Sequence, residues 1–158
     1  MNDIDPAPRP WVGHTTAGVR EPAINSDRGL EVVVIYTGVK QTLAALRTAG
    51  GLARGLNARI RLIVPQVVPY PAPLEEPPVQ KSFAERRFRT LAEEAAIETK
   101  IDIWLCRNRE AVLSEHLKPR SVVVIAAARQ RWWRPSRERR LARILRRQMH
   151  QVVLVDSD

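Results

Sequence analysis

Residues 32–68 read VVVIYTGVKQTLAALRTAGGLARGLNARIRLIVPQVV, and this stretch decides the fold. It begins inside a β-branched run over 31–37 that ends at Gly38 and has the length of a buried strand. Leucines and alanines then recur at helical spacing over 42–57, and a second apolar run follows over 59–68. Two apolar strands joined by a helix predict a parallel crossover unit.

The same alternation continues after a proline-rich loop over 69–79. We expect helices over 82–96, 110–117 and 136–149, and strands over 100–106, 121–127 and 151–155. Strict alternation of strands and helices predicts an α/β fold, a doubly wound, five-stranded parallel sheet with helices on both faces. Residues 30–158 are expected to form this one domain, since a chain of 158 residues suits a single core.

Residues 1–29 have a different character, with four prolines, three glycines and no apolar periodicity. We expect a flexible arm there. Its acidic, proline-rich start lacks the basic-then-apolar order of a signal peptide. The longest apolar runs are also shorter than the roughly 18 residues that a membrane span needs. A cytoplasmic protein with no membrane span is therefore expected.

Positive charge is concentrated in one segment. The formal net charge is +9, and residues 129–147 hold nine arginines against one glutamate. Trp132 and Trp133 lie side by side within this segment. Charge that is localised in this way indicates a surface that faces something anionic.

Three segments resemble the universal stress proteins. Residues 32–68 are similar to their opening strand–helix–strand unit. Residues 101–129 (IDIWLCRNREAVLSEHLKPRSVVVIAAAR) resemble the unit that precedes their nucleotide loop, and residues 140–156 (RLARILRRQMHQVVLVD) resemble their closing helix and strand. The resemblance covers residues 30–156. It implies a homodimer that pairs through the last strand, at Val152, Val153, Leu154 and Val155.

The resemblance also locates a nucleotide site. ATP-binding members of that family carry an aspartate after the first strand and the motif G-x2-G-x9-G-[ST] after the fourth. The matching region of this chain contains Thr37, Gly38, Ala126, Arg129, Arg139 and Arg140. Glycines let backbone N–H groups approach phosphates, and no glycine follows Gly55. We therefore expect a degenerate nucleotide site with no bound cofactor.

Four interpretations of the arginine segment remain open. The residues concerned are Arg131, Trp132, Trp133, Arg134 and Arg137. They suit an acidic protein partner, because Trp and Arg are enriched at interface hot spots. They also suit nucleic acid, with arginine on phosphates and tryptophan stacked on unpaired bases. In the third interpretation arginines hold a phosphate-containing small molecule, and in the fourth they form a solvated helix face.

No catalytic or metal-binding constellation is evident. Cys106 lies in an apolar strand and is expected to be a core residue rather than a nucleophile. The histidines are far apart, and Arg86, Arg87 and Arg89 alternate with glutamates as solvated ion pairs would. The sequence therefore predicts a non-enzymatic regulatory or scaffolding module that acts as a dimer through its arginine–tryptophan surface.

Overall fold

The computed structural model describes residues 10–17, 29–74, 81–129 and 136–157. Its elements are β1 (Pro10–Ala17), β2 (Glu31–Ile35), α1 (Val39–Leu56), β3 (Arg59–Val67), α2 (Lys81–Glu94), β4 (Thr99–Cys106), α3 (Arg109–His116), β5 (Val122–Ala128), α4 (Arg137–Arg147) and β6 (Gln151–Ser157). Strands and helices alternate from β2 onward, as the apolar periodicity predicts.

One mixed sheet runs through the molecule in the order β1-β4-β3-β2-β5-β6. The strands β2 to β6 are parallel to one another, so the predicted five-stranded parallel sheet is confirmed. The order reverses at β2, from which the chain builds outward first to β3 and β4 and then to β5 and β6. This reversal creates a switch point between β2 and β5.

The first strand is a correction to the sequence analysis. Residues 10–17, expected in a flexible arm, form β1 and pair antiparallel with β4, with Pro10 opposite Trp104 and Ala17 opposite Thr99. An unpaired edge strand offers free N–H and C=O groups to any extended segment, and β4 is such an edge. The prolines and glycines in and around this segment are typical of a loop, so the sequence does not indicate a strand there. The other parts of the expected arm, residues 1–9 and 18–28, lie outside the described residues.

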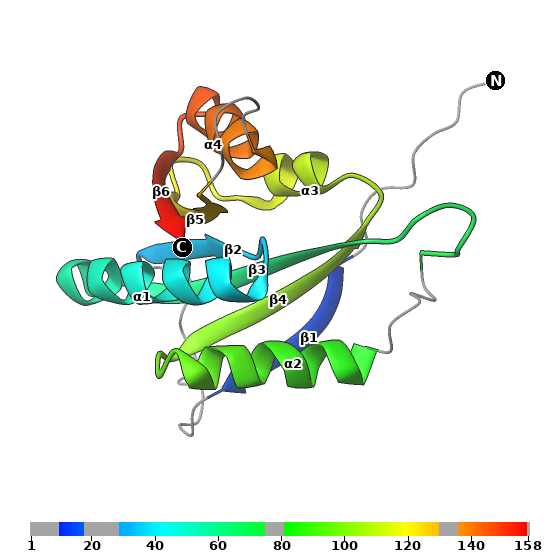
Figure 1. Ribbon diagram of the computed structural model, residues 1–158, viewed down its shortest axis with the longest axis horizontal. Helices are drawn as coiled ribbons and strands as arrows, with labels where there is room; N and C mark the ends of the chain where they lie inside the picture. Colours follow the sequence, from blue (N-terminus) through cyan, green and yellow to red (C-terminus); the bar gives the residue numbers. More distant parts are fainter. Residues whose placement is uncertain (1–9, 18–28, 75–80, 130–135, 158) are drawn as a thin grey trace.

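Helices cover the two faces of the sheet in pairs. In Figure 1, α1 and α2 lie on one side of the sheet and α3 and α4 on the other. Each pair packs on its own apolar cluster: Ala45, Leu46 and Phe88 belong to the first cluster, and Leu113 and Leu145 to the second. The helix that follows β2, α1, lies on one face, and the helix that follows β5, α4, lies on the other.

Close packing explains why a glycine lies in the middle of α1. A Cβ atom at Gly50 would come within 2.6 Å of Ile97 Cδ1, so only glycine admits this approach without a shift. The helix ends at Asn57, whose left-handed φ of 48° supplies the usual C-terminal turn. This contact packs the middle of α1 against the segment that joins α2 to β4.

Candidate functional site

The carboxyl ends of β2 and β5 form the first candidate site. In open α/β sheets, ligands bind where the loops after two neighbouring strands diverge to opposite faces. Thr37 and Gly38 follow β2, and Ala126 lies near the end of β5. The structure brings Thr37 and Ala126 together, in agreement with their expected proximity.

A hydrogen bond ties these two strand ends to each other. The Thr37 hydroxyl donates to the Ala126 carbonyl oxygen at 2.9 Å, and the Thr37 N–H donates to the hydroxyl of Thr42 at 3.4 Å. Thr42 is itself fully buried. The polar groups of Thr37 therefore serve the fold, and the family's aspartate has no acidic counterpart here.

Gly38 has no conformational reason to be glycine. Its φ of 175° is extended backbone, which any residue adopts. A Cβ atom there would meet the Gln41 Oε1 atom at 2.5 Å, and this is the far end of a flexible side chain. The strand-end turn is thus an ordinary one, without the close backbone approach that a phosphate cradle requires.

The arginines of the degenerate nucleotide site are directed to protein acceptors. Arg139 forms an ion pair with Asp156 of β6 at 2.7 Å, and Arg140 lies 3.7 Å from Glu110 of α3. The backbone N–H of Arg129 donates to the Ser157 carbonyl oxygen at 3.1 Å. Arg139 and Arg140 thus face carboxylates on two different elements, and the interpretation in which arginines hold a phosphate-containing molecule stays a prediction.

The outer side of α4 forms the second candidate site, which we call the arginine face. It consists of six exposed side chains: Arg137, Arg139, Arg140, Arg143, Arg146 and Arg147. The opposite side of the helix buries Leu141, Ala142 and Leu145. This division arises because the buried residues recur at three- and four-residue spacing and the exposed positions are all arginine, while Glu138 and Ile144 are half-buried.

Three of these arginines make no side-chain hydrogen bond or ion pair with the described part of the chain. They are Arg137, Arg143 and Arg147, whereas Arg139 and Arg140 face carboxylates and Arg146 donates to the Val152 carbonyl oxygen at 3.1 Å. Ser136 caps the helix by accepting the N–H of Arg139, so the first turn is well ordered despite its charge. Of the predicted docking residues, Arg131, Trp132, Trp133 and Arg134 lie outside the described residues.

The strand β6 lies at an edge of the sheet, as expected. Its residues Val152, Val153, Leu154 and Val155 are all half-buried. Val153 and Val155 pack toward the cluster under α1 and α2, and Val152 and Leu154 toward the cluster under α3 and α4. Within the described chain, β6 pairs with β5 alone, so no strand covers its outer edge, although the Arg146 side chain already occupies the Val152 carbonyl oxygen there.

Buried polar side chains support no nucleophile or metal site. Cys106 is buried as predicted, and burial raises the pKa of its thiol to about 11, so the reactive thiolate is scarce at neutral pH. Among the described residues, no three His, Cys, Asp or Glu side chains are grouped to hold a metal ion. No helix within these ranges is long and apolar enough to cross a membrane.

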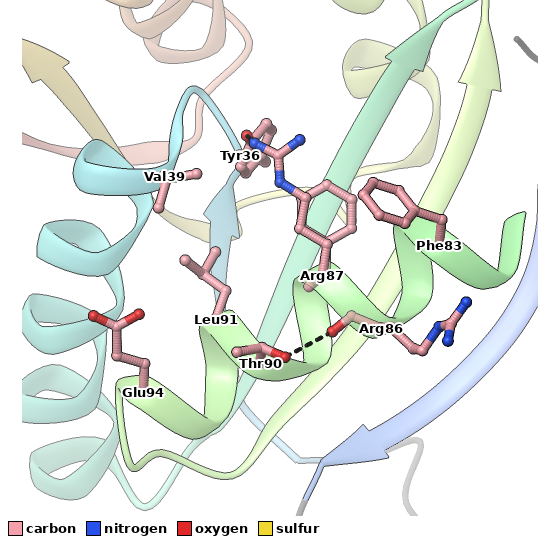
Figure 2. A pocket seen from close by; sticks show the side chains of 9 residues that line it. Tyr36, Val39, Phe83, Arg86, Arg87, Thr90, Leu91 and Glu94 are labelled. Atoms are coloured by element: carbon pink, nitrogen blue, oxygen red, sulfur yellow. Dashed lines mark hydrogen bonds between the residues drawn. The ribbon is translucent and has the colours of Figure 1, made fainter. Parts of the chain in front are cut away.

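A pocket between α1 and α2 was missed by the sequence analysis. It has a volume of about 560 Å³ and is lined by Tyr36 after β2, by Val39 at the start of α1 and by seven side chains of α2 (Figure 2). The expected ion pairs of Arg86, Arg87 and Arg89 are also absent from the described residues; Arg87 instead approaches the Tyr36 hydroxyl at 3.5 Å. Tyr36 and Arg87 are 51 positions apart, so local periodicity carries no signal for this contact.

Comparisons with known proteins give a structural relationship only. No protein-family model matches the chain, and no curated protein matches it. A universal stress protein from Archaeoglobus fulgidus is similar in structure with a TM-score of 0.50 and 12% identity, over 82% of this chain and 93% of that one. Two further solved structures each cover 82% of this chain and are covered over 98% of their own length. One is a universal stress protein in complex with cAMP (TM-score 0.49, 18% identity), and the other is the Archaeoglobus fulgidus protein in complex with dAMP (TM-score 0.46, 9% identity). The chain therefore has the fold of the universal stress proteins.

Proposed function

We propose that this chain is a non-catalytic docking module whose arginine face binds an acidic segment of a partner protein. The observation that carries the proposal is the set of six exposed arginines on one side of an 11-residue helix. Four of them lack a carboxylate among the described residues. Uncompensated charge of one sign attracts and orients a partner of the opposite sign.

The shape of the arginine face favours a narrow partner. Glu110 on α3 and Asp156 on β6 flank it through their contacts with Arg140 and Arg139. A wide ligand such as a nucleic-acid duplex would bring phosphates close to both Glu110 and Asp156, and these carboxylates would repel them. The unpaired Arg143 and Arg147 are four positions apart, a spacing that matches acidic residues on one face of a partner helix. An acidic helix or extended acidic peptide therefore fits this face better than a nucleic-acid duplex.

The switch point supports a role without nucleotide. Thr37 uses its hydroxyl to bond Ala126, and Arg139 and Arg140 are already paired with carboxylates. A nucleotide at this position would have to compete with those contacts and would find no glycine-built loop. We accordingly assign the module no cofactor and no enzymatic activity.

Binding measurements with charge-reversal variants test this proposal. A fluorescent poly-glutamate peptide is titrated into the wild-type chain, into R143E/R147E and into the control K40E/R47E. The control reverses two exposed cations of α1, on the other side of the sheet. We expect R143E/R147E to weaken peptide binding at least about tenfold while K40E/R47E has little effect.

The other ligand classes serve as competitors. Single-stranded DNA of similar length that binds more tightly than the peptide would replace the acidic-protein assignment with a nucleic-acid one. Micromolar binding of ATP, cAMP or dAMP would overturn the assignment of a module without nucleotide. Equal loss of peptide binding in both double variants would show that net charge, rather than the arginine face, is responsible.

We also propose that two copies associate through β6. The support is the outer edge of this strand, which no other strand of the described chain covers, and its four half-buried aliphatic side chains, Val152 to Val155. Pairing along the whole edge requires Arg146 to release the Val152 carbonyl oxygen. An edge strand of this kind is a template for pairing with another chain. An isologous pair would place two arginine faces on one assembly and so present two docking surfaces to a partner.

A further inference from the structure

The pocket between α1 and α2 is separate from the arginine face, and through Tyr36 and Val39 it adjoins the turn that carries Thr37. It lies on the side of the sheet that α1 and α2 cover, whereas α4 lies on the opposite side (Figure 1). Its volume of about 560 Å³ falls in the range of small-molecule sites. Any ligand of this pocket is therefore independent of the docking function proposed above.

The walls of the pocket are largely apolar. Phe88 and Leu91 are buried beneath it, while Phe83 is 56% exposed and Val39 is 39% exposed. Figure 2 shows Val39, from α1, and Leu91, from α2, on opposite sides of the space. An aromatic ring or short aliphatic body placed here would remove apolar surface from water on both sides. The pocket thus selects a ligand with an apolar body.

One end of the pocket carries positive charge and a hydroxyl donor. Arg87 donates to the Tyr36 hydroxyl oxygen at 3.5 Å, which leaves the phenolic proton of Tyr36 free to donate to a ligand. Arg86 contacts only the Ser82 carbonyl oxygen of its own helix, at 3.3 Å. Neither arginine meets a carboxylate within the described ranges. The Tyr36 ring is held edge-on against Phe88 at 4.9 Å, so this donor group is fixed in place.

The other end of the pocket carries negative charge. Glu94 lines the pocket two helical turns after Arg87, about 10 Å along the helix axis, and forms no ion pair with any described residue. Its carboxylate repels a second anionic group on a ligand whose first group lies at Arg87. The charge pattern therefore favours one anionic group at the Tyr36 end and excludes polyanions.

We propose that this pocket binds a small monocarboxylate with an aromatic or aliphatic body. The carboxylate is bound by the Arg87 guanidinium and the Tyr36 hydroxyl, and the body lies between Val39, Phe83 and Leu91. Charge-assisted hydrogen bonds to guanidinium are the strong polar contacts of such a site. Glu94 limits the ligand to a single negative charge.

Calorimetric titration of the full chain with three probes tests the site. The probes are 4-phenylbutyrate, the uncharged 4-phenyl-1-butanol and the dicarboxylate 4-(3-carboxypropyl)benzoate, whose second carboxylate lies at the far end of the ring. We expect 4-phenylbutyrate to bind most tightly, and R87Q to weaken its binding about tenfold. The matched variant R89Q changes an exposed arginine of the same helix outside the pocket and should bind as the wild type does.

Two further variants separate the parts of the proposal. E94Q should improve the binding of 4-(3-carboxypropyl)benzoate and leave that of 4-phenylbutyrate nearly unchanged. R143E/R147E should bind 4-phenylbutyrate as the wild type does, so a failure of the docking function is distinguishable from a failure of this site. The proposal is overturned if 4-phenylbutyrate and 4-phenyl-1-butanol bind equally, if R87Q has no effect, or if none of the probes binds.

Discussion

At the scale of single residues, Thr37 shows how the switch point is held together. Its hydroxyl bonds the Ala126 carbonyl across 89 positions of sequence. We expect T37V, which keeps the side-chain shape but leaves that carbonyl without its partner, to lower the free energy of unfolding by about 1–2 kcal/mol. Urea denaturation of the wild type and the variant measures the difference.

Thr48 offers the control for this change. Its hydroxyl donates to the Ala44 carbonyl of the same helix at 3.2 Å, and that oxygen already accepts a helical N–H. T48V should therefore change the free energy of unfolding by no more than about 0.5 kcal/mol. If the two variants lose equal stability, the bond between Thr37 and Ala126 has no special role.

His150 gives the stability of the protein a pH dependence. The side chain is buried, and burial lowers its pKa below the ordinary value of 6.5. The folded state therefore keeps His150 neutral while the unfolded chain already binds a proton. The free energy of unfolding is therefore unaffected by His150 above pH 6.5, where the side chain is neutral in both states. It decreases as the pH falls through 6.5 toward the lower pKa of the folded state.

We expect the free energy of unfolding to decrease between about pH 7.5 and pH 5.5, and the decrease to be smaller in H150Q. The variant H116Q leaves His150 in place and should retain the wild-type decrease. Denaturation at several pH values measures all three chains. A pH profile in H150Q that is parallel to the wild-type profile would assign the dependence to other groups.

Among the helices and strands, those with the most regular apolar periodicity were predicted most accurately from the sequence. The buried run of β2 and the arginine–leucine alternation of α4 predict their elements within one or two residues. The end of β6 was missed by two residues, because Asp156 and Ser157 are polar yet still pair with β5. The strand β1 was missed entirely, since prolines and glycines surround it and its pairing partner lies almost 90 positions away.

The pairing of β1 with β4 can be tested by substitution in β1. Thr15 and Thr16 lie opposite Ile101 and Lys100. In an antiparallel pair successive residues point their N–H groups to opposite sides, so T15P/T16P removes at least one bond of this ladder. We expect faster amide hydrogen exchange in β4 and unchanged exchange in β5, which β1 does not contact. Unchanged exchange throughout would contradict the pairing.

At the scale of the whole molecule, the sequence predicted the architecture and only part of the candidate sites. The resemblance placed Thr37 and Ala126 in one region, and the structure joins them. It also aligned Arg139 and Arg140 with the family's glycine motif, but it carries no signal for their contacts with Asp156 and Glu110, which come from other elements. The pocket at Tyr36 and Arg87 depends on how α2 packs beside α1, which periodicity within one helix does not encode.

The proposed dimer is a property of the whole molecule, and V155K tests it. Val155 is half-buried on β6, so a lysine there extends its stem along apolar surface and its ammonium into solvent, where it opposes pairing of two edges. We expect the wild type to sediment as a dimer and V155K as a monomer with nearly the same melting temperature. The control L56K introduces the same charge at an exposed leucine at the end of α1 and should remain dimeric. V155K leaves Asp156, the partner of Arg139, in place on β6. The arginine face and its peptide affinity per chain should therefore be unchanged when the dimer is lost. A wild-type chain that sediments as a monomer at micromolar concentration would remove the basis for pairing through β6.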